Sequence, residues 1–176
     1  MKTEQDKTLE GIKIAVQMEI EGKKYYLQAS QKIANELGKK LLASLAAEED
    51  VHRRKFKEIY NTIRNNRDWP VTDFRPDGGR RLRTIFAMTA SETDTKVKGA
   101  ETELDAIQTA ISMESKTYDF YQSRGKDALY EAERNFYQLL AVEEREHHLV
   151  LLDYYEYLYD PAGWFIAKEH SSLDGG

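Results

Sequence analysis

The chain has 176 residues, of which 40% are hydrophobic and 32% charged, with three prolines and a formal charge of −5. This composition is typical of a single helix-rich globular domain over residues 1–176, and the acidic balance argues against a general nucleic-acid binder. There is no cysteine, which excludes disulfides, thiolate nucleophiles and cysteine-based zinc or iron–sulfur sites within the chain. We also find no signal peptide and no stretch long enough to cross a membrane, so we expect a soluble, cytoplasmic protein.

Helical periodicity dominates the chain and predicts four long helices. They are expected at about residues 5–36, 39–65, 100–124 and 128–159. We expect the first helix to stop at Asn35–Gly38, with Gly38 as its C′ residue, and the fourth to stop before Pro161. Short connections after the first and third helices predict two antiparallel hairpins, and hence an all-α four-helix bundle. Residues 161–176 show no helical periodicity and are expected to form a non-helical tail.

A long crossover is predicted between the hairpins, over residues 66–99, which contain two prolines and the pair Gly78–Gly79. A helix of about 25 residues is about 38 Å long. A connection that runs back along it therefore needs at least about 12 extended residues. The remaining length has room for a short helix, RRLRTIFAM, and we expect its Leu82, Ile85 and Phe86 side to cap the bundle.

The second half of the sequence repeats the first at a shift of 95 positions, because residue 19 corresponds to 114, 49 to 144 and 52 to 147. VQMEIEGKKYY aligns with ISMESKTYDFY, and LAAEEDVH aligns with LAVEEREH. One shift therefore relates three pairs of residues, which are Glu19 with Glu114, Glu49 with Glu144, and His52 with His147.

Each of these six residues stands at a helix position where the pattern predicts an apolar core side chain. Burying one isolated carboxylate would be strongly unfavourable, and four together would repel each other unless cations neutralised them. Four glutamates and two neutral histidines suit two divalent ions such as iron or manganese. In Glu-x-x-His the two side chains share a helix face, so both can reach one metal.

Glu48 and Glu143 stand directly before two predicted ligands and compete with them for the metal-facing position. The spacing of three and four residues that runs through the second helix includes Glu49, whereas Glu48 lies about 100° away around the helix. We therefore expect Glu49 and Glu144 to be ligands, and we expect the neighbouring acids to be solvated, namely Glu48, Glu143 and Glu146.

A less specific interpretation has to be weighed against this one. A single Glu-x-x-His in a charged helix is a weak motif, and a lone glutamate on an apolar face is often an edge residue. Two such motifs and two lone glutamates in one repeat register are hard to obtain by chance. The pattern therefore favours a metal site over a metal-free helical interaction module.

At these residues the sequence resembles the ferritin-like di-iron carboxylate superfamily, and within it the di-iron domain of rubrerythrins and erythrins. That fold places a lone glutamate on each of two helices and Glu-x-x-His on each of the other two. The resemblance implies a ferritin-like bundle with two iron ions, or manganese in place of iron. It also implies the ligand roles: Glu19 and His52 as terminal ligands of one ion, Glu114 and His147 of the other, and Glu49 and Glu144 as bridges.

The chain departs from the family pattern in three places. Rubrerythrins carry an extra glutamate one turn after the third-helix ligand, where this chain has Thr117 and, at the repeat-related position, Gly22. Without cysteines there is no rubredoxin module, so electrons are expected from a separate donor such as rubredoxin. Haem-binding relatives have a methionine where this chain has Asp50, so no haem is expected. Gly22 either leaves room for dioxygen or peroxide beside the metals or is simply tolerated.

Tyr26 and Tyr121 are also related by the repeat and follow the lone glutamates by two helical turns. Their hydroxyls are expected to hydrogen-bond to ligand carboxylates on a neighbouring helix. Packing in the core is the alternative role for an aromatic residue at such a position.

The resemblance implies an oxidoreductase whose di-ferrous site reacts with hydrogen peroxide or dioxygen, a peroxidase or ferroxidase. The main alternative is a ferritin-like iron-storage protein. Storage cages use a fifth short helix, and residues 161–176 do not predict one. We therefore expect a homodimer rather than a cage.

Overall fold

The structure is a computed structural model, and it describes residues 3–66, 68–90 and 99–173. Six helices make up most of it: α1 (Glu4–Lys32), α2 (Glu36–Asn66), α3 (Arg80–Ala90), α4 (Glu101–Asp127), α5 (Glu131–Tyr159) and α6 (Pro161–Leu173). The described residues contain no β-strand, so the predicted all-α class is confirmed. None of the described helices combines the length and the hydropathy of a membrane-crossing segment.

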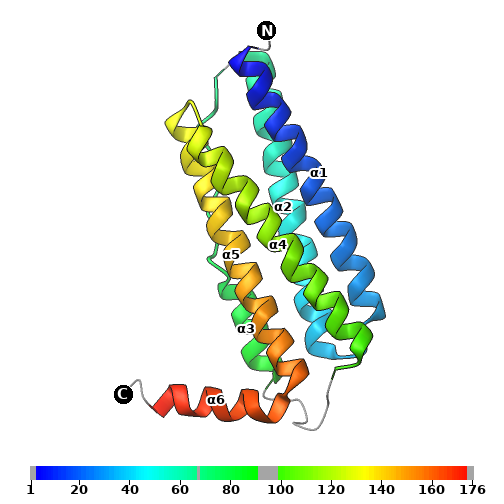
Figure 1. Ribbon diagram of the computed structural model, residues 1–176. Coiled ribbons are helices and arrows are strands. Elements are labelled where there is room, and N and C mark those ends of the chain that lie inside the picture. The colour runs from blue at the N-terminus through cyan, green and yellow to red at the C-terminus, as the bar shows by residue number, and fades with distance from the viewer. Residues whose placement is uncertain (1–2, 67, 91–98, 174–176) are drawn as a thin grey trace.

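The four long helices form two antiparallel hairpins, α1 with α2 and α4 with α5 (Figure 1). The hairpins lie side by side, with α1 against α4 and α2 against α5. α2 ends at the same end of the bundle as the N-terminus, and the chain then runs back along the bundle before α4 begins at the opposite end (Figure 1). The predicted bundle of two hairpins joined by a long crossover is therefore confirmed.

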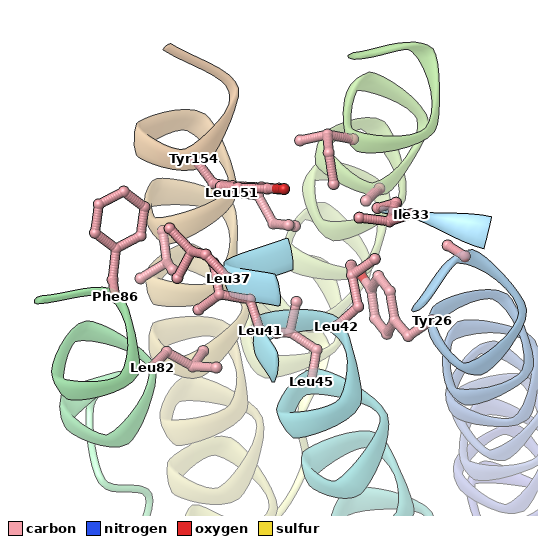
Figure 2. Packing of buried hydrophobic residues seen from close by; sticks show 14 of the residues in the cluster. Tyr26, Ile33, Leu37, Leu41, Leu42, Leu45, Leu82, Phe86, Leu151 and Tyr154 are labelled. Atoms are coloured by element: carbon pink, nitrogen blue, oxygen red, sulfur yellow. The ribbon is translucent and has the colours of Figure 1, made fainter. Parts of the chain in front are cut away.

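Buried apolar side chains form two clusters along the bundle. The first is rich in leucines and includes Leu37, Leu41, Leu42, Leu45 and Leu151 (Figure 2). The second is rich in aromatic residues and includes Phe56, Trp69, Tyr121, Phe136 and Tyr137. On each long helix the predicted ligands lie, in sequence, between members of the two clusters. The centre of the bundle is therefore polar, with an apolar cluster on either side of it.

The predicted short helix is present as α3, but its position differs from the prediction. Leu82 and Phe86 are buried against the leucine cluster on the flank of α2 and α5 rather than over an end of the bundle (Figure 2). The crossover runs along the side of the bundle. The apolar side of α3 therefore packs against the sides of α2 and α5.

The boundary between the first two helices was wrongly predicted at Gly38. α1 ends at Lys32, and Gly38 lies in the first turn of α2. The side chain of Asn35 accepts hydrogen bonds from the backbone N–H groups of Leu37 and Gly38, so it caps the start of α2. Gly38 is required there by close packing, because a Cβ would lie 2.2 Å from the Tyr154 hydroxyl.

The prediction of a non-helical tail over residues 161–176 was wrong, because α6 occupies Pro161–Leu173. Proline ends a preceding helix but is well tolerated at the first position of a new one. Asp160 accepts a hydrogen bond from the N–H of Gly163 and so caps α6. Trp164 packs on Phe86, and α6 runs from the end of α5 below α3 and outwards from the bundle (Figure 1).

Candidate metal centre

The six predicted ligands meet in the middle of the bundle. Each of the four long helices contributes from the face that it turns towards the other three, and none of the six residues is more than 3% exposed. They are Glu19 from α1, Glu49 and His52 from α2, Glu114 from α4, and Glu144 and His147 from α5. The repeat therefore produces a nearly symmetric site, with one lone glutamate and one Glu-x-x-His from each hairpin.

The ligand atoms fall into two overlapping groups of four residues, and within each group they lie within 4.8 Å of one another. One group holds Glu19 and His52, and the other holds Glu114 and His147. Both groups contain Glu49 and Glu144. Two metal ions placed in the two groups would share these two carboxylates, which is the geometry of a carboxylate-bridged pair.

The histidines turn their Nδ1 atoms towards the carboxylates. His52 Nδ1 lies 3.4 Å from both Glu19 Oε2 and Glu144 Oε1. His147 Nδ1 lies 3.6 Å from Glu114 Oε2 and 3.7 Å from Glu49 Oε1. A cation between these atoms would be bound by one nitrogen and several oxygens.

Unpartnered buried atoms are concentrated at this centre. Of the eleven buried side-chain nitrogen and oxygen atoms without a hydrogen-bond partner in the described residues, seven belong to the six predicted ligands. Both oxygens of Glu144 are among them, as are both Nδ1 atoms. Buried polar atoms are normally satisfied. The donor set is of the hard oxygen-and-imidazole type that binds divalent iron or manganese, so these residues fit a pair of such ions.

The pKa shifts divide the four glutamates into two pairs. Burial raises the pKa of Glu49 well above 4.5, and the charges of Glu19 and Glu144 raise it further. Burial and the charge of Glu114 raise the pKa of Glu144 in the same way. Burial also acts to raise the pKa of Glu19 and of Glu114, but the adjacent histidine and other contacts outweigh it and hold both below 4.5. Without metal, the two shared carboxyl groups are therefore the pair that is harder to ionise.

The histidines provide the positive charge in the metal-free chain. Burial acts to lower the pKa of His52 and His147, but the surrounding carboxylates outweigh it and raise both well above 6.5, with Glu19 the main contributor at His52 and Glu114 at His147. The raised pKa values favour protonated histidines in the metal-free chain. Divalent ions bind ionised carboxylates and neutral imidazoles, so metal binding should release protons.

Both predicted tyrosines contact ligand carboxylates across the two hairpins. Tyr26 of α1 donates a hydrogen bond to Glu114 of α4, and Tyr121 of α4 donates one to Glu19 of α1. Burial and the neighbouring carboxylates raise the pKa of both phenols well above 10, so both remain hydrogen-bond donors. The two contacts are related by the repeat and hold one oxygen of each lone glutamate.

The acids next to the predicted ligands are not simply solvated, as the sequence had suggested. Glu143 is buried and Glu48 half-buried, and each lies beside a histidine of the other hairpin. Glu146 is half-buried and pairs with Arg83 of α3. Helical phase assigns these residues correctly to a neighbouring face of the helix. It could not show that the crossover covers that face.

Gly22 and Thr117 are related by the repeat, and each follows a lone glutamate by one helical turn. A Cβ on the buried Gly22 would lie 3.4 Å from Glu49 Oε2, so glycine leaves space for little more than a methyl group beside this carboxylate. The Thr117 hydroxyl donates to the backbone oxygen of Met113 at 3.1 Å and is therefore bound to its own helix.

One surface cavity reaches the centre. It has a volume of about 140 Å³, lies between α2, the crossover and α5, and is lined by residues that include His52, Phe74, Arg75, Arg81 and Glu143. A larger cavity of about 480 Å³ lies between the end of α1 and the start of α4, and none of the six predicted ligands lines it. Of these two cavities, only the smaller one is lined by a predicted ligand, His52.

A bundle of two helical hairpins with a buried, twofold-repeated centre of glutamates and histidines defines the ferritin-like carboxylate class of proteins. Comparison with sequence families gives a more specific result: the model of the Rubrerythrin family matches residues 10–155. The chain therefore belongs to the rubrerythrin family, as the sequence motifs had indicated. No curated protein and no solved structure matches it significantly.

Proposed function

We propose that this protein is a non-haem di-iron oxidoreductase that reacts with hydrogen peroxide or dioxygen, a peroxidase or ferroxidase. The observation that carries the proposal is the set of seven unpartnered ligand atoms on six buried residues. Glu19 and His52 would bind one ion, Glu114 and His147 the other, and Glu49 and Glu144 both. Manganese in one position would use the same residues.

The ions, when bound, would supply the two electrons that, with two protons, reduce hydrogen peroxide to two molecules of water. The protein's own residues position the ions and limit access to them. Tyr26 and Tyr121 restrain Glu114 and Glu19, and the two apolar clusters keep water away from both ends of the centre. A small oxidant would enter through the cavity at His52.

Electrons would come from a separate donor protein such as rubredoxin, because the chain contains no cysteine with which to form a rubredoxin-type iron site. The homodimer, the cytoplasmic location and the absence of haem remain predictions of the sequence.

An anaerobic titration of the metal-free protein with ferrous iron tests the proposal. We expect saturation at two ions per chain, followed by a change in the absorption spectrum when peroxide or dioxygen is added. Comparing the two oxidants at equal concentration identifies the preferred one. Glu146→Ala is a matched control, because Glu146 pairs with Arg83 and contributes to neither group of ligands. Failure to bind iron would exclude the proposed reaction.

Iron storage is the second candidate, and α6 favours it more than the sequence did. The expected lack of a fifth short helix was an argument against a ferritin-like cage, and α6 removes that argument. Gel filtration with light scattering separates the candidates, since a homodimer has twice the 20.4 kDa mass of the chain and a cage is many times larger.

A metal-free interaction module remains the contrasting hypothesis. This hypothesis gives the buried carboxyl groups no function, although an apolar side chain at each position would be less unfavourable. It predicts that a chelator leaves the melting temperature unchanged, whereas bound metal should stabilise the fold by mass action.

A further inference from the structure

Glu48 and Glu143 are related by the same repeat as the ligands, and each contacts a histidine of the other hairpin. His147 of α5 donates a hydrogen bond from Nε2 to Glu48 Oε2 of α2 at 2.8 Å. His52 Nε2 of α2 lies 3.6 Å from Glu143 Oε2 of α5. In both cases Nε2 faces the second carboxylate while Nδ1 faces the metal centre.

We propose that Glu48 and Glu143 are positioning residues, each of which fixes the metal-binding nitrogen of a histidine on the opposite hairpin. This inference rests on the proposed di-metal function. An imidazole that donates a hydrogen bond from Nε2–H to a carboxylate keeps its lone pair on Nδ1, and the hydrogen bond holds the ring at one angle. Because the contacts cross between hairpins, they also set the separation of the two halves of the site.

A third metal site is the alternative use of these groups, since ligand atoms of Glu48, Glu143 and His147 lie within 4.8 Å of one another. His147 would then have to bind one ion through Nδ1 and another through Nε2, which requires the imidazole to lose both protons. The hydrogen bond of 2.8 Å to Glu48 instead uses the Nε2 proton. The two carboxylates therefore act as acceptors for the histidines.

Among the described residues, the crossover hydrogen-bonds to one of the two positioning carboxylates, Glu143. The backbone N–H of Gly78 donates to Glu143 Oε1 at 3.0 Å, and Gly78 has a φ of 64°, which favours glycine. Phe74 of the same segment packs edge-on against His52, with 5.7 Å between the ring centroids. Glu48 has only the more distant Ser44 hydroxyl, at 3.5 Å, on its other oxygen. The position of the crossover is thus transmitted through Glu143 to His52, and His147 has no equivalent connection among the described residues.

Cobalt(II) binding to the full-length, metal-free protein tests this inference, because its visible spectrum reports ligand geometry independently of turnover. The titration is made against a competing chelator, so that two dissociation constants are obtained. Glu48→Ala and Glu143→Ala should each weaken one of the two ions by about 10-fold to 100-fold and change its spectrum. Glu48→Gln and Glu143→Gln should recover part of the lost affinity, because an amide oxygen can still accept a hydrogen bond from Nε2–H.

Glu21→Ala is the control, since Glu21 is exposed on α1 and accepts a hydrogen bond from Gln17 rather than from either histidine. It should leave both constants and the spectrum unchanged. Gly78→Ala tests the connection to the crossover: its Cβ would meet nothing within 4 Å, so only the backbone conformation is disturbed. It should weaken the same ion as Glu143→Ala and not the ion affected by Glu48→Ala.

Circular dichroism of each variant establishes that the bundle is folded. If folded Glu48→Ala and Glu143→Ala bind both ions with wild-type constants and spectra, the positioning role is refuted while the di-metal proposal stands. An effect of Gly78→Ala on both ions equally would refute the one-sided connection to the crossover. If the wild-type protein binds no divalent metal, the proposed function itself fails, and the positioning role fails with it.

Discussion

The two halves of the metal centre have the same ligands but different supports. The half with His147 has a direct hydrogen bond of 2.8 Å to Glu48. In the half with His52 the corresponding distance to Glu143 is 3.6 Å, and Glu143 is shared with the N–H of Gly78. The repeat duplicated the hairpins but not the crossover, whose described residues hydrogen-bond to Glu143 and not to Glu48. Equal sets of ligands therefore have unequal surroundings.

The surroundings of the two tyrosines differ in the same way. Tyr26 belongs to the leucine cluster, whereas Tyr121 lies in the aromatic cluster, 5.7 Å from Phe56 and 5.9 Å from Tyr137 between ring centroids. The repeat-related position of Tyr137 is Leu42. Both hydroxyls nevertheless reach a lone glutamate. The groups that touch the ligands are repeated, while the packing behind them is not.

Removing a shared carboxylate should affect both halves and have the largest effect. Glu144→Ala deletes a residue common to both groups and should abolish binding of the pair, with a loss of affinity above about 100-fold, more than a supporting residue would cause. Glu19→Ala should spare the half with His147. Iron counted per chain distinguishes these results. One tightly bound ion in Glu144→Ala would contradict its shared role.

The stability of the metal-free protein should fall as the pH rises above 6.5. The folded-state pKa values of His52 and His147 are raised, so their stabilising contribution is complete below the unfolded value of 6.5 and is lost as the pH passes the folded values. The raised pKa values of Glu49 and Glu144 act in the same direction, because ionising them in the core is unfavourable.

Metal should reverse this trend, because it binds the deprotonated ligands. A free ion at 100 times its dissociation constant should add about 2.7 kcal/mol to the free energy of unfolding. Thermal unfolding from pH 5 to pH 9, with and without manganese(II), measures both slopes. Parallel slopes would contradict the assignment of the titrating groups to the metal centre.

Removing one tyrosine hydroxyl should have a moderate effect. Tyr26→Phe and Tyr121→Phe each leave one carboxylate oxygen without its donor, which should lower the free energy of unfolding of the metal-free protein by about 1–3 kcal/mol. Urea unfolding measures the loss. Tyr25→Phe is a control, because the Tyr25 hydroxyl donates to the backbone of Ala106 away from the ligands. Equal losses at the two positions would show that the hydroxyl contact matters more than the surrounding cluster.

The smallest effect is expected at the repeat-related pair Gly22 and Thr117. Gly22→Ala should gain about 1 kcal/mol from helix propensity, less the effect of a Cβ that lies 3.4 Å from Glu49 Oε2. Its unfolding free energy should therefore stay within about 1 kcal/mol of wild type. Thr117→Ala is the repeat-related comparison. A strong loss of peroxide consumption in Gly22→Ala alone would show that the space beside Glu49 is used by the oxidant.

Much of the fold could be read from the sequence, because helical periodicity is local and strong over helices of this length. The errors fell at helix ends. The fourth helix does end before Pro161, as predicted, but Pro161 opens α6 rather than a non-helical tail. Asn35, expected at the end of the first helix, caps the start of α2. Both residue types can stand at either side of such a boundary. Tertiary packing is what decides these boundaries. Gly38, in the first turn of α2, lies against Tyr154, and Trp164 of α6 lies against Phe86.

The sequence by itself determined which six residues gather at the centre, because four helical faces and one repeat shift place them there and helical phase separates them from the adjacent Glu48 and Glu143. It could not determine the roles of Glu48 and Glu143, since helical phase turns them away from the metals and only the crossover and the opposite hairpin bring partners to that side. Ligand positions depend on spacing within a helix, which is local. The contacts that orient the ligands depend on where separate helices cross, and that is decided only when the whole chain packs.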